Sequence, residues 1–217
     1  MVAKQVTSRA RQAKNVARAL WQAGCIQIHT RPYYTWASGL RSPIYADNRL
    51  LLSDVAARDV VLRASLARLK LGPQPQVIAG VATSGIPMAT LIAHRLKKPL
   101  VYVRPAPKGH GRGRQIEGTF KKGARVLLVE DLVSTGSSSL EAARALRRGG
   151  ARLSQVLCTF AYLPQQCGRS FARARLPLVS LCDAETLLTV GIEGGYIGPR
   201  HELAARSFLE KLKKHFS

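Results

Sequence analysis

The chain has 217 residues, 46% of them hydrophobic, which suffices for one domain with a sizeable core. Its formal net charge of +22 favours anionic ligands, but the 34 lysines and arginines are spread along the whole chain and form no basic tail. No apolar run approaches the roughly 18 residues that a membrane-spanning helix needs, so we expect no membrane partner. Residues 1–20 mix five cations with alanines and valines, which predicts an amphipathic helix of a cytoplasmic protein; an organelle transit peptide is the alternative.

The expected elements alternate along the chain. In the N-terminal part we expect a helix at residues 4–23, short strands at 25–28, 33–36 and 42–46, and a helix that Ser53 caps and that ends near Leu69. Strands at 77–81, 100–103, 126–129, 153–162 and 178–181 follow, with helices at 87–95 and 138–148 and further helices at the C-terminal end. Continuous apolar strands that alternate with helices predict a doubly wound, mainly parallel α/β sheet flanked by helices. No repeat or linker divides it, so we expect a single domain over residues 1–217.

The run from Val126 to Ser138 is the most informative segment. Its four apolar residues indicate a strand buried on both faces, and Glu130 and Asp131 follow at the carboxyl end, where open α/β sheets bind ligands. A hydroxyl-rich turn around Gly136 then leads into a helix, and the backbone N–H groups of such a turn suit a phosphate. Carboxylates repel phosphate but accept hydrogen bonds from sugar hydroxyls. The segment therefore predicts a phosphorylated sugar as the ligand.

A plainer interpretation of this segment stays open. Glu130 and Asp131 could be a solvated strand end, and the serines could only cap the helix. Ser138-x-x-Glu141 does match a capping box. The segment is neither a Walker A loop nor a dinucleotide-binding fingerprint.

Residues 104–118 combine four glycines with several cations and almost nothing apolar. A stretch this long without a core pattern is usually functional or disordered. We interpret it as a mobile lid that closes over a polyphosphate; a disordered basic loop is the alternative. Residues 82–87, Ala-Thr-Ser-Gly-Ile-Pro, indicate a second anion-binding turn, although the same pattern begins an ordinary helix.

The four cysteines show no C-x-x-C spacing, which argues against a zinc site. We expect them to be reduced, and we expect Cys158 and Cys182 to be buried in strands.

Several motifs together resemble one family. Val129-Glu130-Asp131-Leu132-Val133-Ser134-Thr135-Gly136 is similar to the signature of type I phosphoribosyltransferases. Three further groups of residues resemble the orotate phosphoribosyltransferase branch in particular. They are Tyr34-Thr35-Trp36-Ala37-Ser38-Gly39 with Ser42-Pro43-Ile44-Tyr45, Lys108-Gly109-His110-Gly111 with Gln115-Ile116-Glu117-Gly118, and Gly191-Ile192-Glu193-Gly194-Gly195-Tyr196-Ile197. The resemblance runs over nearly the whole chain.

This resemblance implies a reaction and its partners. The 5-phosphoribosyl group would pass from 5-phosphoribosyl 1-diphosphate (PRPP) to N1 of orotate, giving orotidine 5′-monophosphate and diphosphate in pyrimidine (UMP) biosynthesis. Mg²⁺ would accompany the diphosphate of the substrate, with no residue assigned as a direct metal ligand. The implied assembly is a homodimer in which the lid of one subunit closes over the active site of the other. The implied fold adds a small N-terminal hood of helix and strands.

The resemblance also assigns residue roles. Arg104, Lys108 and His110 match the family's catalytic contacts to the diphosphate, with Lys108 as the main electrostatic stabiliser and His110 as a hydrogen-bond donor. Glu130 and Asp131 would hold the ribose hydroxyls. The remaining PRPP-binding positions form the turn that follows the carboxylates and would bind the 5-phosphate: Leu132, Val133, Ser134, Thr135, Gly136, Ser137 and Ser138. Ser134 also matches a position that touches orotate.

Some cations of the family are absent from this chain. Pro105, Ala37 and Ser84 stand where many members carry lysine, and no arginine lies near Tyr162. We therefore expect backbone N–H groups near residues 38–41, or the side chain of Arg41, to hold the orotate carboxylate.

Two alternative functions would share the phosphate-binding turn. A purine phosphoribosyltransferase has no need of Ser42-Pro43-Ile44-Tyr45 or of the Lys-Gly-His lid. A regulator that binds nucleic acid and senses the phosphorylated sugar would explain the +22 charge but not an intact lid. We therefore expect an enzyme with small-molecule substrates, and we do not expect nucleic acid to be its partner.

Overall fold

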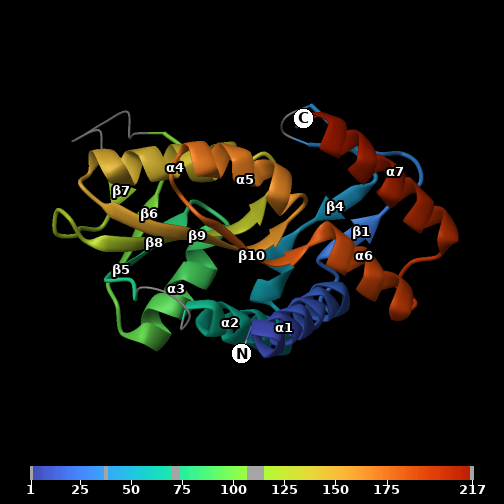
Figure 1. Ribbon diagram of the computed structural model, residues 1–217, viewed down its shortest axis with the longest axis horizontal. Coiled ribbons are helices and arrows are strands. Elements are labelled where there is room, and N and C mark those ends of the chain that lie inside the picture. Colours follow the sequence, from blue (N-terminus) through green and yellow to red (C-terminus); the bar gives the residue numbers. More distant parts are fainter. Residues whose placement is uncertain (1, 37–38, 70–73, 107–114, 216–217) are drawn as a thin grey trace.

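A six-stranded sheet in the order β10-β9-β8-β5-β6-β7 forms the centre of the computed structural model, which describes residues 2–36, 39–69, 74–106 and 115–215 (Figure 1). Five strands run parallel, and β7 (Ile116–Glu117) pairs antiparallel with β6 at one edge. The parallel strands are β5 (Val77–Val81), β6 (Leu100–Val103), β8 (Arg125–Val133), β9 (Arg152–Ala161) and β10 (Leu178–Asp183). The mainly parallel sheet predicted from the sequence is confirmed.

Helices cover both faces of this sheet (Figure 1). On one face lie α1 (Val2–Gln22), α2 (Val55–Leu69) and α3 (Gly85–Leu96), and on the other lie α4 (Ser137–Arg148) and α5 (Pro164–Arg173). Alternate residues of each strand point to opposite faces. Leu127 and Val129 of β8 therefore join the core with α1–α3, whereas Val126 and Leu128 join the core with α4 and α5. Burial on both faces explains why the strands read as continuous apolar runs.

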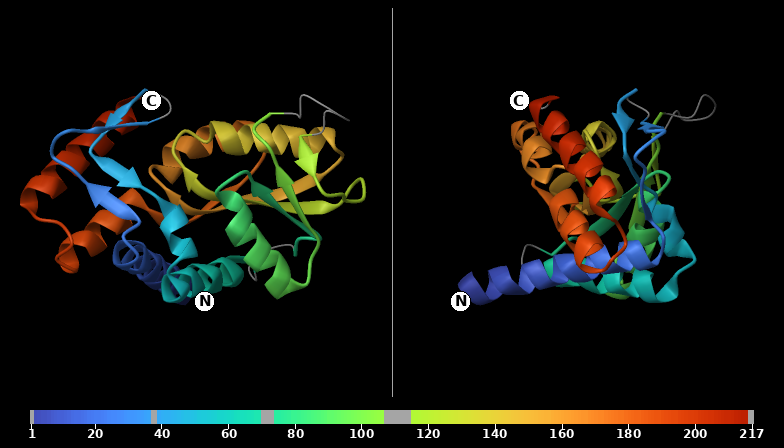
Figure 2. Two further views of the ribbon diagram at one scale, coloured as in Figure 1. Left: turned by 180° about the vertical axis from the view of Figure 1, so that it is seen from behind. Right: turned by 90° about the vertical axis from the view of Figure 1, so that its right-hand side faces the viewer.

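Both ends of the chain contribute to the hood beside the sheet. The short strands pair as β1 (Ile26–Ile28) with β4 (Ile44–Ala46) and as β2 (Tyr34–Thr35) with β3 (Arg41–Ser42). The helices α6 (Ala184–Glu193) and α7 (Pro199–His215) lie on the same side of the molecule (Figure 2). Trp36 meets the ring of Phe208 in α7 edge-on at 5.5 Å, and the indole N–H of Trp21 in α1 donates to the carbonyl of Leu187 in α6 at 2.9 Å.

Several local expectations were wrong. Pro43, which has no N–H to donate, separates β3 from β4, where one strand was expected. The side chain of Asp54, not Ser53, caps α2 by accepting the N–H of Ala57 at 2.9 Å. The 3₁₀ helix η1 (Asn48–Leu52) and the helix α5 were not expected.

The start of α4 also differs from the capping-box prediction. Its N-cap is Gly136, which makes no side-chain cap, and Ser138 lies inside the helix. Glycine serves here because the residue has φ +85°, in the left-handed region that other residues rarely adopt.

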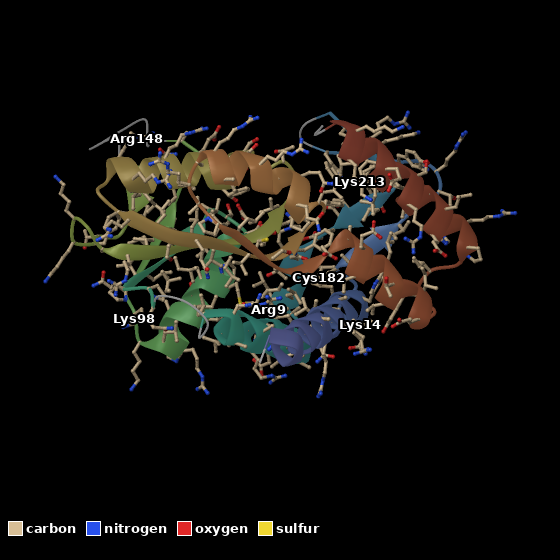
Figure 3. The ribbon with its side chains drawn as sticks, in the orientation of Figure 1. Arg9, Lys14, Lys98, Arg148, Cys182 and Lys213 are labelled. Atoms are coloured by element: carbon tan, nitrogen blue, oxygen red, sulfur yellow. The ribbon has the colours of Figure 1, made fainter. Side chains whose placement is uncertain are left out.

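The four cysteines are free and buried, and burial was expected for Cys158 and Cys182. Within the described residues, no helix is long and apolar enough to cross a membrane. The basic side chains project from separate elements on several sides of the molecule, such as Arg148 of α4, Lys98 beyond α3 and Lys213 of α7 (Figure 3). The spread of charge seen in the sequence thus persists in space.

Candidate active site

The two adjacent carboxyl groups of β8 lie close enough to interact, but they contact different elements of the fold. The strand does not end at Val129 but continues to Val133, so both residues belong to β8. Asp131 lines a pocket on the face of α2 and α3. Glu130, only 6% exposed, faces α4 and accepts a hydrogen bond from the hydroxyl of Ser139 at 3.2 Å.

Burial governs the protonation of both carboxyls. It raises the pKa of Glu130 well above the usual range, and the neighbouring charge of Asp131 raises that pKa further. Burial also raises the pKa of Asp131, while a hydrogen bond from Glu130 lowers it. Glu130 therefore keeps its proton to higher pH than an exposed glutamate does, and of the two carboxyl groups it is the one whose pKa is raised further.

The pocket has a volume of about 450 Å³ and joins two of the segments that the sequence singled out. Thr83 and Ser84, from the turn before α3, face the same space as Asp131 at the end of β8. The turn approaches β8 closely, because a Cβ on Gly85 would lie 2.5 Å from the carbonyl oxygen of Val129. The other lining residues are Asn48, Arg49, Leu51, Leu52, Arg58, Pro87, Met88, Leu91 and Thr159.

The turn after β8 has the form of an anion-binding site. Leu132 and Val133 still belong to the strand, where they pair with Phe160 and Ala161 of β9. Ser134, Thr135 and Gly136 then make the turn, and α4 begins at Ser137. The first N–H groups of a helix have no partner within it, and the helix dipole adds positive potential there. The hydroxyls of Thr135 and Ser137 lie 3.0 Å apart at the same place.

Helix α5 supports this turn from behind. The thiol of Cys167 donates to the carbonyl of Ser134 at 2.8 Å. The ring of Phe171 packs on Gly136 so closely that a Cβ there would lie 2.6 Å from its Cε2 atom. Sequence reasoning missed this support, although the spacing of Cys167 and Phe171 and the proline at the start of α5 could have indicated a helix with one buried face.

The base of the expected lid is closed by hydrogen bonds. The N–H of Arg104 donates to the carbonyl of Gln115 at 2.9 Å, and the side-chain amide of Gln115 donates to the carbonyl of Arg104 at 3.0 Å. The guanidinium of Arg104 lies 3.7 Å from the carboxylate of Glu117. Lys108 and His110 lie outside the described residues, so their catalytic roles stay predictions.

The surroundings of the expected orotate site are aromatic. The ring centroids of Trp36 and Tyr162 lie 4.5 Å apart, and the hydroxyl of Tyr162 donates to the carbonyl of Ile44 at 3.3 Å. Arg41, a candidate for the orotate carboxylate, is exposed with its guanidinium 5.9 Å from the ring centre of Tyr33.

Asn48 is a further site residue that the sequence did not indicate. It is buried in the wall of the pocket, and its side-chain amide donates to the main-chain carbonyl of Asp131 at 2.8 Å. The two residues are 83 positions apart, so no local pattern connects them.

Comparisons with known proteins agree with this geometry. The model of the Phosphoribosyl transferase domain family matches residues 56–169, from α2 into α5. The fold, the carboxylate at the end of β8 and the turn that follows it thus define a phosphoribosyltransferase. The orotate phosphoribosyltransferase of Oceanobacillus iheyensis is 40% identical over 200 residues, which are 92% of this chain and 99% of the relative. The chain belongs to the orotate phosphoribosyltransferase family, as its motifs indicated.

Solved structures give the same assignment. The orotate phosphoribosyltransferase of Aeropyrum pernix superposes with a TM-score of 0.70 at 35% identity, over 84% of this chain and 99% of that one. The UMP synthase of Leishmania donovani superposes with a TM-score of 0.80 at 27% identity, over 92% of this chain but 42% of the longer protein. These neighbours share the type I phosphoribosyltransferase fold expected from the sequence.

Proposed function

We propose that the chain transfers the 5-phosphoribosyl group from PRPP to orotate, giving orotidine 5′-monophosphate and diphosphate. The bond between ribose C1 and the diphosphate oxygen breaks, and a bond between C1 and N1 of orotate forms as N1 loses its proton. One observation carries the proposal: Asp131 and the turn at residues 83–84 face a common pocket, and the turn at residues 134–137 continues from the same strand as Asp131. Family membership supplies orotate as the acceptor.

Each part of this site has a distinct proposed role. The carboxylate of Asp131 accepts hydrogen bonds from the ribose hydroxyls, and the turn at residues 134–137 binds the 5-phosphate through N–H groups. Glu130, which the sequence also assigned to the ribose, accepts the N–H of Asp131 at 3.1 Å and so helps to hold that residue in place. Negative charge builds on the departing diphosphate, and Lys108, His110 and Arg104 are proposed to stabilise it, as the family resemblance implies.

Mg²⁺ is proposed to arrive with PRPP. Among the described residues there is no group of three or more His, Cys, Asp or Glu side chains that could hold a metal ion. Oxygen atoms such as those of a diphosphate are the ligands that Mg²⁺ prefers. When bound, the ion would neutralise part of the charge on the leaving group.

The homodimer is supported by an exposed apolar group beside the pocket. Leu50 and Leu52 of η1 and Val55 of α2 are 42%, 48% and 61% exposed. Covering them with a second subunit would bury apolar surface next to the site that the partner's lid is proposed to close. The cytoplasmic location stays a prediction from the sequence.

The reaction is tested by following the absorbance of orotate, which should fall only when protein, Mg²⁺ and PRPP are all present. Turnover of a purine base without turnover of orotate would refute the proposal. Asp131→Asn removes a charged acceptor and should weaken the binding of ribose 5-phosphate about 10- to 150-fold in calorimetry. Asp59→Asn, at an exposed position of α2, is the matched control and should bind as the wild type does.

A further inference from the structure

We infer that Asn48 is a positioning residue that fixes the main chain at Asp131 and thereby the direction of the carboxylate that binds the ribose. The inference rests on the proposed role of Asp131. It starts from a contact between distant segments, in which the amide nitrogen of Asn48 in η1 donates to the carbonyl oxygen of Asp131 at 2.8 Å. Both residues line the same pocket.

The contact lies where β8 extends beyond its pairing with β5. Strand β8 pairs with β5 only as far as Val129, opposite Gly80, although it continues to Val133. Beyond Val129 the strand therefore lacks a β-ladder partner on the β5 side. Asn48 supplies a side-chain donor to this extension, at the residue whose carboxylate faces the pocket. It takes over the restraint that a neighbouring strand would otherwise give.

The amide oxygen of Asn48, unlike its nitrogen, has no hydrogen-bond partner among the described residues. A carbonyl only accepts, so the NH₂ group of Asn48 must face Asp131 and the amide oxygen must point elsewhere. That oxygen is buried and has no hydrogen-bond partner, in a side chain that is 6% exposed. An unpaired buried acceptor costs more free energy than one neutral hydrogen bond gains. Leucine in its place would remove this unpaired oxygen but would leave the carbonyl of Asp131 without its donor, so the two effects on stability oppose each other. The benefit of asparagine lies in what it does to Asp131.

Asn48→Leu tests the inference, because it keeps the volume and removes the donor. We expect its unfolding midpoint in urea to lie close to that of the wild type, while the Kd for ribose 5-phosphate rises about 3- to 10-fold. Asn48→Asp keeps the shape but places an acceptor against the carbonyl, so it should weaken binding at least as much. Asn15→Leu, on the exposed part of α1, replaces the same residue type away from the pocket and should leave the Kd unchanged.

A double-mutant cycle separates positioning from a general structural role. If Asn48 acts through the carboxylate, adding Asn48→Leu to Asp131→Asn should change the Kd by less than about twofold. The inference is overturned if Asn48→Leu binds ribose 5-phosphate as the wild type does, if its effect is undiminished beside Asp131→Asn, or if Asn48→Leu does not fold. Normal binding by Asp131→Asn alone would instead refute the proposed role of Asp131.

Discussion

Gly136→Ala should destabilise the protein and disturb the phosphate-binding turn, for two separable reasons. The residue has φ +85°, and a left-handed conformation costs alanine about 1–2 kcal/mol. The added Cβ would also lie 2.6 Å and 3.1 Å from two ring atoms of Phe171, which is buried and cannot swing into solvent. Overpacking of this kind costs about 1–3 kcal/mol. We therefore expect the free energy of unfolding to fall by about 2–5 kcal/mol in urea denaturation.

Gly123→Ala is the matched control for this prediction. Gly123 has nearly the same φ, +83°, but nothing lies within 4 Å of the position of its Cβ. It should lose only the backbone part, about 1–2 kcal/mol, and should bind ribose 5-phosphate normally. Adding Phe171→Leu to Gly136→Ala should recover part of the lost binding by removing the ring. Equal destabilisation by the two alanine variants would refute the steric argument, and unchanged ribose 5-phosphate binding by Gly136→Ala would refute the role of the turn.

Two further predictions concern Glu130 and the lid. Burial raises the pKa of Glu130 in the folded state, so the folded protein retains a proton that the unfolded chain releases. The free energy of unfolding should therefore fall as pH rises from about 4.5 through the folded-state pKa. Glu130→Gln should weaken this slope in urea denaturation at several pH values and still bind ribose 5-phosphate; a large loss of binding would show that the Glu130 carboxylate itself holds the sugar. Lys108→Ala should lower kcat more than it raises the KM for PRPP, with Lys98→Ala beyond α3 as the control, and a pure rise in KM would mean that the lysine contributes only ground-state affinity.

The strands of the sheet could be predicted well because the pattern that indicates each strand lies within the strand itself. The strands at residues 77–81 and 100–103 have the same bounds in the structure, since continuous apolar runs between turn residues are typical of strands buried on both faces. The family assignment was also within reach, because its motifs are contiguous. Each such motif is a short run of consecutive residues, so no knowledge of tertiary contacts was needed to find it.

The sequence could not predict the end of β8 or the contacts between residues that are distant in the chain, because both depend on the tertiary structure. The apolar run stops at Val129, so Glu130 and Asp131 were expected to follow the strand and to face one ligand together. In the structure β8 continues through them, with Glu130 bonded to Ser139 of α4 and Asp131 lining the pocket. The contact of Asn48 with Asp131 joins residues 83 positions apart, and no sequence pattern in either segment indicates it.

The groups that support the sugar site come from three elements of the fold, α4, η1 and α5. Ser139 of α4 holds the carboxyl group of Glu130, and Asn48 of η1 holds the main chain of Asp131. Cys167 of α5 holds the turn that follows. Because none of these three is assigned to the leaving group, substitutions at them should change the affinity for the sugar phosphate and leave the sensitivity to diphosphate charge intact. Substitutions in the lid should do the reverse, so binding of the sugar and stabilisation of the leaving group should be experimentally separable in this enzyme.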